Sequence, residues 1–590
     1  MSREIINNYV RFFKDQKRET EKAYSHILDS SVCRLLQEGM LNVGTIYAVF
    51  SRTGTITIKV RKGYAPRLKM LKSFSLVTKK AKSSFGDNIL SWNVTFRDFH
   101  DGVGMRMGES DIMPLYYRKS ADPANDYIVC GSVDLAFFNF IDRCVNEQGK
   151  SLTVLLYEPY PPTDYFENLA YFTYKNPGCK ELLFEPKVSY DDWNPEELSF
   201  NESDPDAIPN TIASTLEDDG CCILQGPPGT GKSYTIATII CSYLHLGKTV
   251  CVATMANSGL VELAKQPPLA GWLADGKIYK TSLKADEIKS ANGLQSAHGD
   301  LTVPKGCLLC TTYYKLSSII GINSARDSRG MFDLIVIEEA SQAFLSTIVA
   351  FKSLGQKCLI VGDPMQLPPI VQGLGQKPEY KLWKVDVQCN GMSAYAMGTD
   401  IKSYRIVTTF RLTAKSASLT KIFYSNQFHS VKKNYLDFKD LSEKYFPHEG
   451  GVLYKFMSGF VDQNYNERSL NFIRELILTL EKHRPESSLA IISPFRETVK
   501  ILQSEFQTDK RVLRELIVET IDRIQGITVD YAILYLPAGD TSFALDERRF
   551  NVATSRSQST TLILSDIELH RLAKFKGKVR KFVQACTPID

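Results

Sequence analysis

The sequence lacks any long apolar run. None of its hydrophobic stretches approaches the ~20 residues that a membrane-spanning helix needs, although 43% of its 590 residues are hydrophobic. The first residues, Met-Ser-Arg-Glu, become charged at once, unlike a secretory signal peptide. We therefore expect an intracellular, cytoplasmic protein without a membrane partner, and a nuclear location stays open.

Cysteine and histidine are present, but in no arrangement typical of a disulfide framework or a zinc site. The 13 cysteines and eight histidines are scattered along the chain, as expected of reduced thiols. One Cys-x-x-Cys pair, Cys307 and Cys310, brackets two leucines and has no second pair. A buried strand is therefore favoured there over zinc.

Net charge is also small, +5 at pH 7, but the charge is unevenly distributed. Between Lys59 and Lys82 the chain has basic residues, interleaved aromatic and apolar ones, and no acid. Such a stripe can follow a nucleic-acid backbone, and it can equally be the solvated face of a small β-domain. Its basic members are Lys59, Arg61, Lys62, Arg67, Lys69, Lys72, Lys79, Lys80 and Lys82.

The hydrophobic pattern changes along the N-terminal third of the chain. Residues 1–40 have apolar side chains at helical spacing, which predicts a helical stalk. Residues 41–160 contain alternating patterns such as Thr55–Arg61, which indicate a β-rich, barrel-like module. Residues 161–205 are rich in Pro, Asp and Glu, and we expect an irregular connector.

From residue 206 the pattern is that of an α/β protein. Short, nearly continuous apolar runs recur, as expected for parallel strands covered by helices on both faces. One series predicts a domain over 206–385, and a second series, beginning at Arg405–Val407, predicts another over 386–590. The runs are 221–224, 249–252, 308–310, 334–337 and 358–361, then 405–407, 489–492, 532–536 and 561–564.

The octapeptide Gly-Pro-Pro-Gly-Thr-Gly-Lys-Ser at 226–233 fits the phosphate-binding P-loop pattern. It lies between an apolar run and a helix-like stretch, which is the context that the pattern needs. Its backbone N–H groups and the helix start would hold phosphate oxygens, with Lys232 on the β- and γ-phosphates and Ser233 on Mg²⁺. The predicted NTP-binding residues are Gly226, Pro227, Pro228, Gly229, Thr230, Gly231, Lys232 and Ser233.

Two further motifs follow predicted strands. Glu338 and Glu339 come after the run 334–337, and we expect the first to hold Mg²⁺ and the second to orient the attacking water as general base. The run 358–361 is followed by Gly-Asp-Pro-Met-Gln, in which Gln366 is a candidate sensor of the γ-phosphate. An ordinary proline-bounded turn is the alternative.

The order and spacing of these motifs resemble the superfamily 1 helicases. The 5′→3′ branch, which includes the nonsense-decay RNA helicase and the Okazaki-fragment nuclease–helicase, is the most similar. The resemblance extends over roughly residues 205–570 and includes six further segments in family order. These are 257–263 (motif Ia), 310–312 (the next threonine motif), 409–412 (Tyr-Arg-Met), 493–496 (Thr-Pro-Tyr-Arg), 518–526 (motif V) and 549–556 (motif VI).

The resemblance implies two tandem RecA-like domains and a helicase or translocase that uses ATP, or other NTPs, with Mg²⁺. Arg411 and Arg556 would be arginine fingers, and Phe410, Gln525 and Gly526 would contact the nucleotide. The partner would be single-stranded DNA or RNA, which the sequence does not distinguish. Its implied contacts are Asn257, Thr311, Thr312, Pro494, Arg496 and Thr520, with Lys59, Arg61, Lys69 and Lys72 of the accessory barrel.

Three positions depart from the family pattern. Glu338 replaces the usual Asp, Asn210 is the nearest amide to the missing adenine-reading Gln, and Thr528 stands where motif V has Glu. The last two departures concern the base and ribose rather than the phosphates, so we expect looser nucleotide selectivity with hydrolysis intact. The segment 265–304 indicates no role.

Two other functional classes fit the sequence. One is a nucleotide-switched binding or scaffold protein that does not unwind nucleic acid. The other is an ATPase subunit of a larger complex with protein partners. Retention of Lys232, Glu339, Arg411 and Arg556 favours an enzyme.

Overall fold

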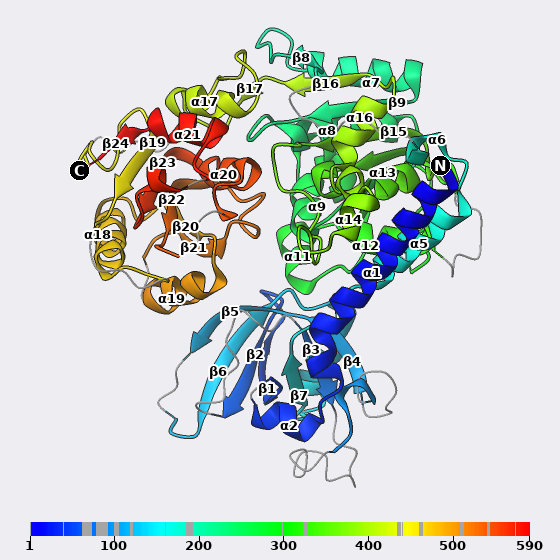
Figure 1. The fold of residues 1–590 in the computed structure, drawn as a ribbon. Coiled ribbons are helices and arrows are strands. Elements are labelled where there is room, and N and C mark those ends of the chain that lie inside the picture. Colours follow the sequence, from blue (N-terminus) through cyan, green and yellow to red (C-terminus); the bar gives the residue numbers. More distant parts are fainter. Residues whose placement is uncertain are drawn as a thin grey trace.

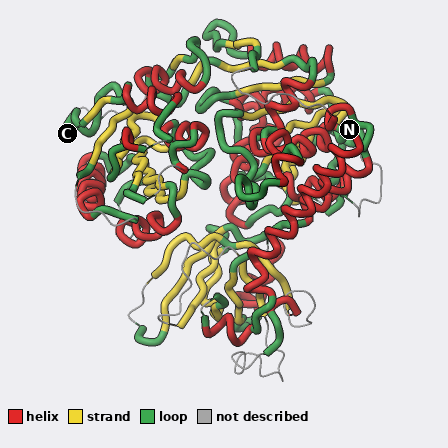
Figure 2. The backbone as a smooth tube through the Cα atoms, in the orientation of Figure 1, coloured by secondary structure: helices red, strands yellow, loops and turns green. Residues whose placement is uncertain are grey.

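The chain folds around three main β-sheets, two parallel and one antiparallel (Figures 1 and 2). This computed structural model describes residues 2–38, 40–61, 73–77, 93–98, 106–118, 122–159, 161–183, 193–297, 299–321, 329–433, 438, 440–458, 464–507, 512–539, 543–572 and 574–589. The predicted α/β class, with two parallel sheets, an N-terminal helical stalk and a β-rich module, is confirmed. No helix in these ranges has both the length and the apolar character needed to cross a bilayer.

The helical stalk is α1 (Ser2–Leu28), and it joins two hydrophobic cores. Ile6, Phe12 and Phe13, at helical spacing, are buried in a core of the nine-stranded parallel sheet. Tyr24 and Ile27, three turns further on, are buried in the core of the antiparallel sheet. The blue helix of Figure 1 therefore runs from one unit to the other.

The antiparallel sheet has the order β4-β3-β7-β1-β2-β6-β5. Its edge strands β4 (Arg106–Asp111) and β5 (Met113–Arg118) are separated in the chain by Ile112 alone, so one bent strand joins the two edges. This is the topology of a closed barrel. The other elements are α2 (Val32–Gln37), β1 (Asn42–Phe50), β2 (Thr55–Arg61), β3 (Ser73–Val77), β6 (Asn125–Gly131), α4 (Leu135–Asp142), the π-helix η2 (Arg143–Glu147) and β7 (Thr153–Tyr157).

The nine-stranded sheet is parallel, in the order β12-β11-β13-β10-β14-β15-β9-β16-β8. Alternate residues of one strand enter different cores: Cys221 and Ile223 one, Cys222 and Leu224 the other. Both faces are therefore covered. The strands are β8 (Glu196–Leu198), β9 (Cys221–Gln225), β10 (Val250–Thr254), β11 (Ile278–Lys280), β12 (Gln295–Ser296), β13 (Leu308–Thr312), β14 (Phe332–Ile337), β15 (Gly355–Gly362) and β16 (Ser403–Ile406).

Short helices surround this sheet and occupy most of the loops between its strands (Figure 1). They are α5 (Asp164–Lys175), α6 (Lys180–Leu183), α7 (Ala207–Asp219), α8 (Lys232–His245), α9 (Asn257–Ala264), η4 (Pro267–Leu269), α10 (Ala270–Ala274), α11 (Ala285–Ser290), α12 (Tyr313–Leu316), η5 (Ser317–Ile320), η6 (Ala340–Gln342), α13 (Leu345–Lys352), α14 (Glu379–Leu382), α15 (Val385–Cys389) and α16 (Gly391–Gly398).

Two predictions of chain organisation are wrong. The strand at 405–407 does not open the second parallel sheet, because β16 pairs with β9 of the first and buries Tyr404 and Ile406 in its core. The segment 161–205 is not simply irregular, because α5 buries Tyr165 and Leu169 in the same unit. In both cases a local pattern carried no information about the distant partner that buries it.

The six-stranded parallel sheet has the order β21-β20-β22-β23-β19-β24, and a two-stranded ribbon precedes it in the chain. The ribbon is β17 (Thr408–Thr409) with β18 (His429–Ser430). The sheet consists of β19 (Gly451–Phe456), β20 (Ser488–Ser493), β21 (Glu515–Thr520), β22 (Val529–Leu536), β23 (Ser557–Ser565) and β24 (Thr587–Pro588). Its helices are α17 (Ala414–Thr420), η7 (Lys421–Phe423), α18 (Glu467–His483), α19 (Arg496–Phe506), α20 (Glu547–Thr554), η9 (Leu569–Arg571) and α21 (Gly577–Gln584).

Candidate active site

The P-loop connects β9 to α8, which begins at Lys232. Gly229 and Gly231 have φ of 73° and 78°, left-handed values that glycine adopts at little cost. The Lys232 ammonium is folded back onto the loop, where it donates to the carbonyl oxygens of Gly226 and Pro227, the latter at 3.3 Å. The partners of the lysine are therefore main-chain oxygens of its own loop.

The charged groups predicted to surround the NTP share one electrostatic neighbourhood. Burial lowers the pKa of Lys232 to about 8, while the charge of Glu338 opposes that change. The guanidinium groups of Arg411 and Arg556 lower the same pKa further. The fold therefore brings these four residues together, although the two arginines are remote from the P-loop in the sequence.

The two glutamates follow β14 and face the P-loop lysine. Burial, and next the charge of Glu339, raise the pKa of Glu338 to about 8. Burial also raises the pKa of Glu339, against hydrogen bonds from the backbone N–H groups of Ala256 and Met255. Each glutamate has one buried carboxylate oxygen without a hydrogen-bond partner.

Unpaired buried carboxylate oxygens are costly, and a cation that binds them removes that cost. The pair of glutamates therefore fits Mg²⁺, a cation that prefers oxygen ligands. Glu338, together with the hydroxyl of Ser233 in the first turn of α8, would hold the ion.

Asp363 is the centre of a hydrogen-bond chain that connects the two parallel-sheet units. Its carboxylate accepts from Gln225 Nε2 at 3.2 Å, from Gln366 Nε2 at 3.0 Å and from the Tyr424 hydroxyl at 2.6 Å. The same hydroxyl accepts from Asn551 Nδ2 of α20 at 2.6 Å. A change at the end of β9, just before the P-loop, thus has a direct polar route to the six-stranded unit.

This chain of contacts passes next to the predicted nucleotide residues of motif V. Gln366 Oε1 accepts a hydrogen bond from Gln525 Nε2 at 3.4 Å, so the two glutamines meet across the units. Gly526, the other predicted residue, is exposed beside it. Sequence reasoning missed the role of Gln225, although a polar residue that ends an apolar strand directly before a P-loop is a usable signal.

The two predicted arginine fingers meet at Ser555. Arg411 Nη1 donates to the Ser555 carbonyl oxygen at 3.4 Å, and Arg556 Nη2 donates to the Ser555 hydroxyl at 3.1 Å. Arg556 is only 1% exposed, and its Nε donates to the Val552 carbonyl at 2.7 Å. Burial lowers the pKa of Arg411 to about 10 and that of Arg556 to about 9, and both groups stay cationic at neutral pH.

The segment that carries Arg411 is docked on the P-loop backbone. The Thr409 hydroxyl donates to the Pro228 carbonyl at 2.9 Å, and the Phe410 N–H donates to the Gly229 carbonyl at 2.8 Å. A Cβ atom on Gly229 would lie 2.2 Å from the Cβ of Arg411 and 2.8 Å from the Thr409 hydroxyl. Glycine is therefore required at 229 for this close approach as well as for its φ.

Replacing Gly229 with alanine is expected to displace the Arg411 segment and to abolish NTP hydrolysis. Gly220→Ala is the matched control, because Gly220 also has a left-handed φ (70°) but open space around it. Both variants should lose about 1–2 kcal/mol of stability from backbone strain. Steady-state hydrolysis and thermal unfolding compare them, and equal activity of the two variants would refute the docking role of Gly229.

An open pocket of about 430 Å³ lies beside the P-loop. Phe410, 42% exposed, is 3.6 Å from a Cβ built on Gly231, and its ring meets that of Phe200 edge-on at 4.9 Å between centroids. Sequence reasoning missed Phe200, one of several aromatic residues in the predicted connector. The pocket is lined by Phe200, Glu202, Phe410, Val431, Lys432 and Lys433.

The pocket does not include the two positions at which the sequence departs from the family's base and ribose contacts. Asn210 is exposed on α7, and Thr528 lies between motif V and β22. Glu202, on the rim, is paired with Lys433 at 2.7 Å between Oε1 and Nζ. Aromatic faces and paired charges, rather than an amide, therefore form the lining.

Predicted nucleic-acid contacts in the first parallel unit are engaged within the protein. Asn257, at the start of α9, accepts from Lys280 Nζ at 3.1 Å. The Thr311 hydroxyl is buried and accepts from the Thr281 hydroxyl at 3.1 Å. The side chain of Thr312 caps α12. Both threonines are buried, so direct contact with a strand through their hydroxyls would require a local rearrangement.

In the second unit the predicted contacts differ in exposure. Pro494 and Thr520 are buried at the ends of neighbouring strands. Arg496 is exposed at the start of α19, where it can reach an external phosphate. The fold therefore gathers these residues at one edge of the sheet, and Arg496 has the accessible cationic group.

The predicted barrel contacts lie partly on β2. Lys59 is opposite Tyr127 in the β2–β6 register, and Arg61 is exposed. Tyr47, 60% exposed, contacts the Tyr127 ring at 4.8 Å between centroids. A cation and two aromatic rings, tilted by 58° to each other, therefore lie together on the outer surface. Lys69 and Lys72, with Lys62, Arg67, Lys79, Lys80 and Lys82, lie outside the described residues.

The segment 265–304, which indicated no role in the sequence, connects the barrel to the parallel sheet. The Ala285 N–H donates to the Val133 carbonyl at 2.8 Å, and Ala285 is buried in the barrel core. Lys280, fully buried, pairs with Glu287 of α11 at 3.0 Å while holding Asn257. Lys280 therefore holds both Asn257 of motif Ia and Glu287 of α11, the helix whose first residue, Ala285, contacts the barrel.

Comparison with known proteins adds evidence independent of this geometry. Two family models, both described as AAA domain, match residues 307–373 and 411–568. These ranges contain Glu338 and Gln366 in the first and Arg411 and Arg556 in the second.

Curated relatives of the chain are helicases. Helicase SEN1 of Saccharomyces cerevisiae is 28% identical over 272 residues, 42% of this chain and 12% of that protein. Probable helicase MAGATAMA 3 of Arabidopsis thaliana is 26% identical over 257 residues, 41% of this chain and 31% of that protein. DNA replication ATP-dependent helicase/nuclease DNA2 of Bos taurus is 23% identical over 383 residues, 58% of this chain and 35% of that protein.

These matches confirm the predicted resemblance to superfamily 1 helicases. Among them, SEN1 and DNA2 are the type that the chain is similar to. The chain spans only 12% to 35% of the length of these three relatives.

Solved structures of viral helicases are also similar, though distantly. Arterivirus nonstructural protein 10 (helicase) is 14% identical with a TM-score of 0.31, covering 61% of this chain and 62% of that one. The PRRSV helicase is 13% identical with a TM-score of 0.33, covering 62% and 55%. Scores this low support no further conclusion.

Proposed function

We propose that this chain is an NTP-dependent helicase or translocase that moves along single-stranded nucleic acid, in the 5′→3′ direction that its family branch implies. The observation that carries the proposal is the docking of the Arg411 segment on the P-loop, with Arg556 beside it. Arginines that reach an NTP from a second domain couple hydrolysis to relative domain motion.

Each charged residue of the site has a role in this proposal. Lys232 would exchange its carbonyl partners for the β- and γ-phosphates. Glu339 would accept a proton from the attacking water, and Arg411 and Arg556 would stabilise the charge that develops on the γ-phosphate. Bound Mg²⁺ would neutralise charge on the phosphates.

The Asp363 chain of hydrogen bonds would transmit the state of the γ-phosphate. Gln366 would respond to that phosphate, and Asp363 would pass the change to Tyr424 and Asn551 of the other unit. Closing and opening of the two units around NTP would then move a bound strand by one step.

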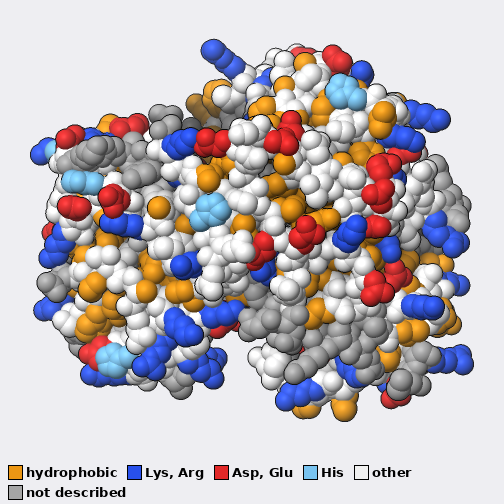
Figure 3. Space-filling view, turned by 90° about the horizontal axis from the view of Figure 1, so that it is seen from above, with side chains coloured by type: hydrophobic (Ala, Val, Ile, Leu, Met, Phe, Trp, Pro, Cys, Tyr) orange, Lys and Arg blue, Asp and Glu red, His pale blue; other side chains and the backbone are white. Residues whose placement is uncertain are grey.

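The surface seen in Figure 3 mixes acidic and basic side chains, as the small net charge leads one to expect.

A DNA or RNA strand would contact Arg496 and the face of β2 that carries Lys59 and Arg61. These groups favour a nucleic-acid backbone together with stacked bases. A nucleotide-switched scaffold, or an ATPase subunit with protein partners, is the second candidate, because the predicted strand contacts Thr311 and Thr312 are buried.

NTPase and strand-separation assays on 5′- and 3′-tailed DNA and RNA test the proposal. We expect hydrolysis stimulated by single strands and unwinding of 5′-tailed substrates, both lost in Lys232→Ala. Lys265→Ala, an exposed lysine paired with Glu262, is the control and should behave as the wild type. Hydrolysis without strand separation would favour the scaffold, and hydrolysis indifferent to Lys232→Ala would refute an enzyme at this site.

The aromatic pocket predicts weak discrimination between bases. We expect ATP and GTP to be hydrolysed with kcat/KM within about tenfold of each other, because stacking tolerates either purine. Phe410→Ala should raise KM for both by roughly 10-fold or more, since base stacking contributes about 1–3 kcal/mol. Tyr174→Ala, an exposed aromatic on α5, serves as the control. Strict ATP dependence would contradict the pocket's assignment.

A further inference from the structure

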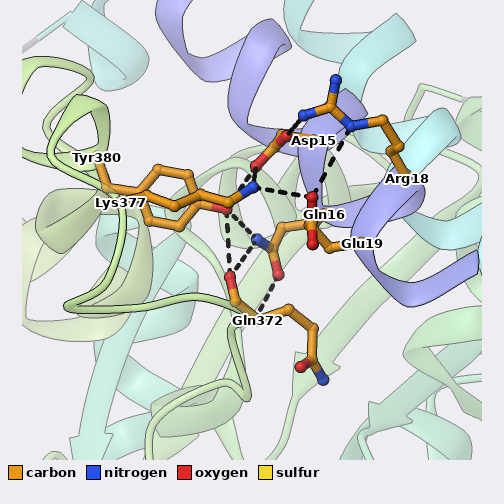
Figure 4. A network of polar contacts seen from close by, with 7 residues as sticks. All are labelled: Asp15, Gln16, Arg18, Glu19, Gln372, Lys377 and Tyr380. Carbon is orange, nitrogen blue, oxygen red and sulfur yellow. Dashed lines mark hydrogen bonds and ion pairs between the residues drawn. The ribbon is translucent and has the colours of Figure 1, made fainter. Parts of the chain in front are cut away.

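Helix α1 is bound to residues 372–380, the segment that follows the predicted γ-phosphate sensor Gln366 (Figure 4). We call the hydrogen bonds and ion pairs between α1 and these residues the grip. Gln16 is fully buried, and its side-chain amide pairs reciprocally with one backbone residue. Its Nε2 donates to the Gln372 carbonyl at 3.0 Å, and its Oε1 accepts from the Gln372 N–H at 2.8 Å. Two antiparallel bonds to the same residue fix both its position and its orientation.

A second set of contacts tightens the grip. The Tyr380 hydroxyl donates to Asp15 Oδ2 at 2.7 Å and accepts from Gln16 Nε2 at 2.6 Å. Lys377 forms ion pairs with Asp15 and, at 3.1 Å, with Glu19. Asp15, Gln16 and Tyr380 are at most 6% exposed, so their hydrogen bonds are shielded from water and hold α1 to residues 372–380.

The other end of the same segment lies in the nucleotide site and in the second unit. Asp363 and Gln366 belong to the hydrogen-bond chain described above. Met365 and Leu367 are buried in a core of the six-stranded sheet. Only residues 368–371, which begin Pro368-Pro369, separate this end from the grip of α1. Consecutive prolines stiffen the backbone, so the connection is short and rigid.

The far end of α1 is embedded in the barrel. Tyr24 and Ile27 are buried in the barrel core, and the Tyr24 hydroxyl donates to the Glu158 carbonyl. A helix of 27 residues is about 40 Å long and rigid on the scale of a domain. A displacement of the barrel thus reaches residues 372–380 along α1, whose other half is buried in the same core as Tyr380.

We propose that α1 transmits nucleic-acid binding at the barrel to the NTP site, and that Gln16 and Tyr380 are its positioning residues. The inference rests on the proposed function. A strand bound to the barrel would shift α1 or fix its position. The grip would then hold Gln366 where it can contact the γ-phosphate. Without a strand, Gln225 and Tyr424 hold Asp363 locally, so basal hydrolysis does not depend on the grip.

The test compares variants of one helix. In Gln16→Ala and Tyr380→Phe we expect stimulation of NTP hydrolysis by single strands to fall by about tenfold, within the usual range of coupling between sites. Basal kcat, KM for NTP and strand affinity should stay at wild-type values. Lys17→Ala removes an adjacent contact of α1, the ion pair with Glu167 of α5, and should keep full stimulation.

Each outcome is decisive. Full stimulation in Gln16→Ala and Tyr380→Phe, or equal loss in Lys17→Ala, would overturn the inference. A parallel fall in basal kcat and unfolding temperature would reduce the grip to a purely structural role and would also overturn it. Tyr380→Phe retains its ring in the core, so it keeps the test valid if Gln16→Ala folds poorly. A wild type without strand-stimulated hydrolysis would instead refute the proposed function.

Discussion

Replacing Arg556 with alanine is expected to lower the rate of NTP hydrolysis by on the order of 10³ to 10⁵. The guanidinium is buried, its pKa of about 9 leaves it charged at neutral pH, and Arg411 is its neighbour. A fixed cation in a water-poor site stabilises transition-state charge without having to reorganise. NTP affinity should change far less, because Lys232 and the P-loop backbone bind the ground state.

Single-turnover hydrolysis and direct nucleotide binding separate these two effects. Arg556→Lys should rescue little, because an ammonium cannot reproduce the bonds of the guanidinium to Val552 and Ser555. Arg571→Ala, a surface arginine of the same unit paired with Glu568, is the control. If Arg556→Ala hydrolyses NTP within tenfold of the wild type while remaining folded, Arg556 is not a finger.

Replacing Glu339 with glutamine is expected to lower hydrolysis by roughly 10²–10⁴, the usual contribution of a general base. Glutamine has the same shape and can still accept from the Ala256 and Met255 N–H groups, but it cannot take a proton from water. NTP should bind at least as tightly, since a negative charge near the phosphates is removed.

Glu338→Gln provides a matched comparison, because it makes the same charge change one residue earlier. A metal-binding role predicts that its defect is partly restored by raising Mg²⁺, whereas the defect of Glu339→Gln is not. Hydrolysis rates measured across a Mg²⁺ titration distinguish the two. Identical responses of the two variants would mean that base and metal ligand have been assigned wrongly.

The parts of the site that the sequence predicted are those made by short contiguous segments. The P-loop needs a strand, a turn rich in glycine and a helix, and residues 221–245 contain all three in order. Glu338 and Glu339 follow an apolar strand, β14, for the same local reason. Helical spacing in residues 1–40 likewise predicted a helical stalk, and α1 (Ser2–Leu28) is its main part.

The contacts that sequence reasoning missed join segments far apart in the chain. Strand β16 belongs to the first sheet rather than the second because its apolar side chains pack there. The four residues of the strand do not by themselves indicate which sheet they join. Phe200 faces Phe410 only after β8 pairs with β16. The bond from Tyr424 to Asp363 likewise depends on how the two units pack.

The sequence by itself determined the α/β class, the phosphate-binding loop and the order of the helicase-like motifs, because backbone conformation and hydrophobic period are local properties. Three contacts became visible only in the folded chain: the Arg411 segment docks on Gly229 through the Phe410 N–H, Asp363 connects the two units, and α1 holds Gln372. Those contacts depend on which buried surfaces and polar groups satisfy one another across separations of 61 to 356 residues in the chain. Their specificity arises from packing and hydrogen-bond geometry, which no short pattern encodes.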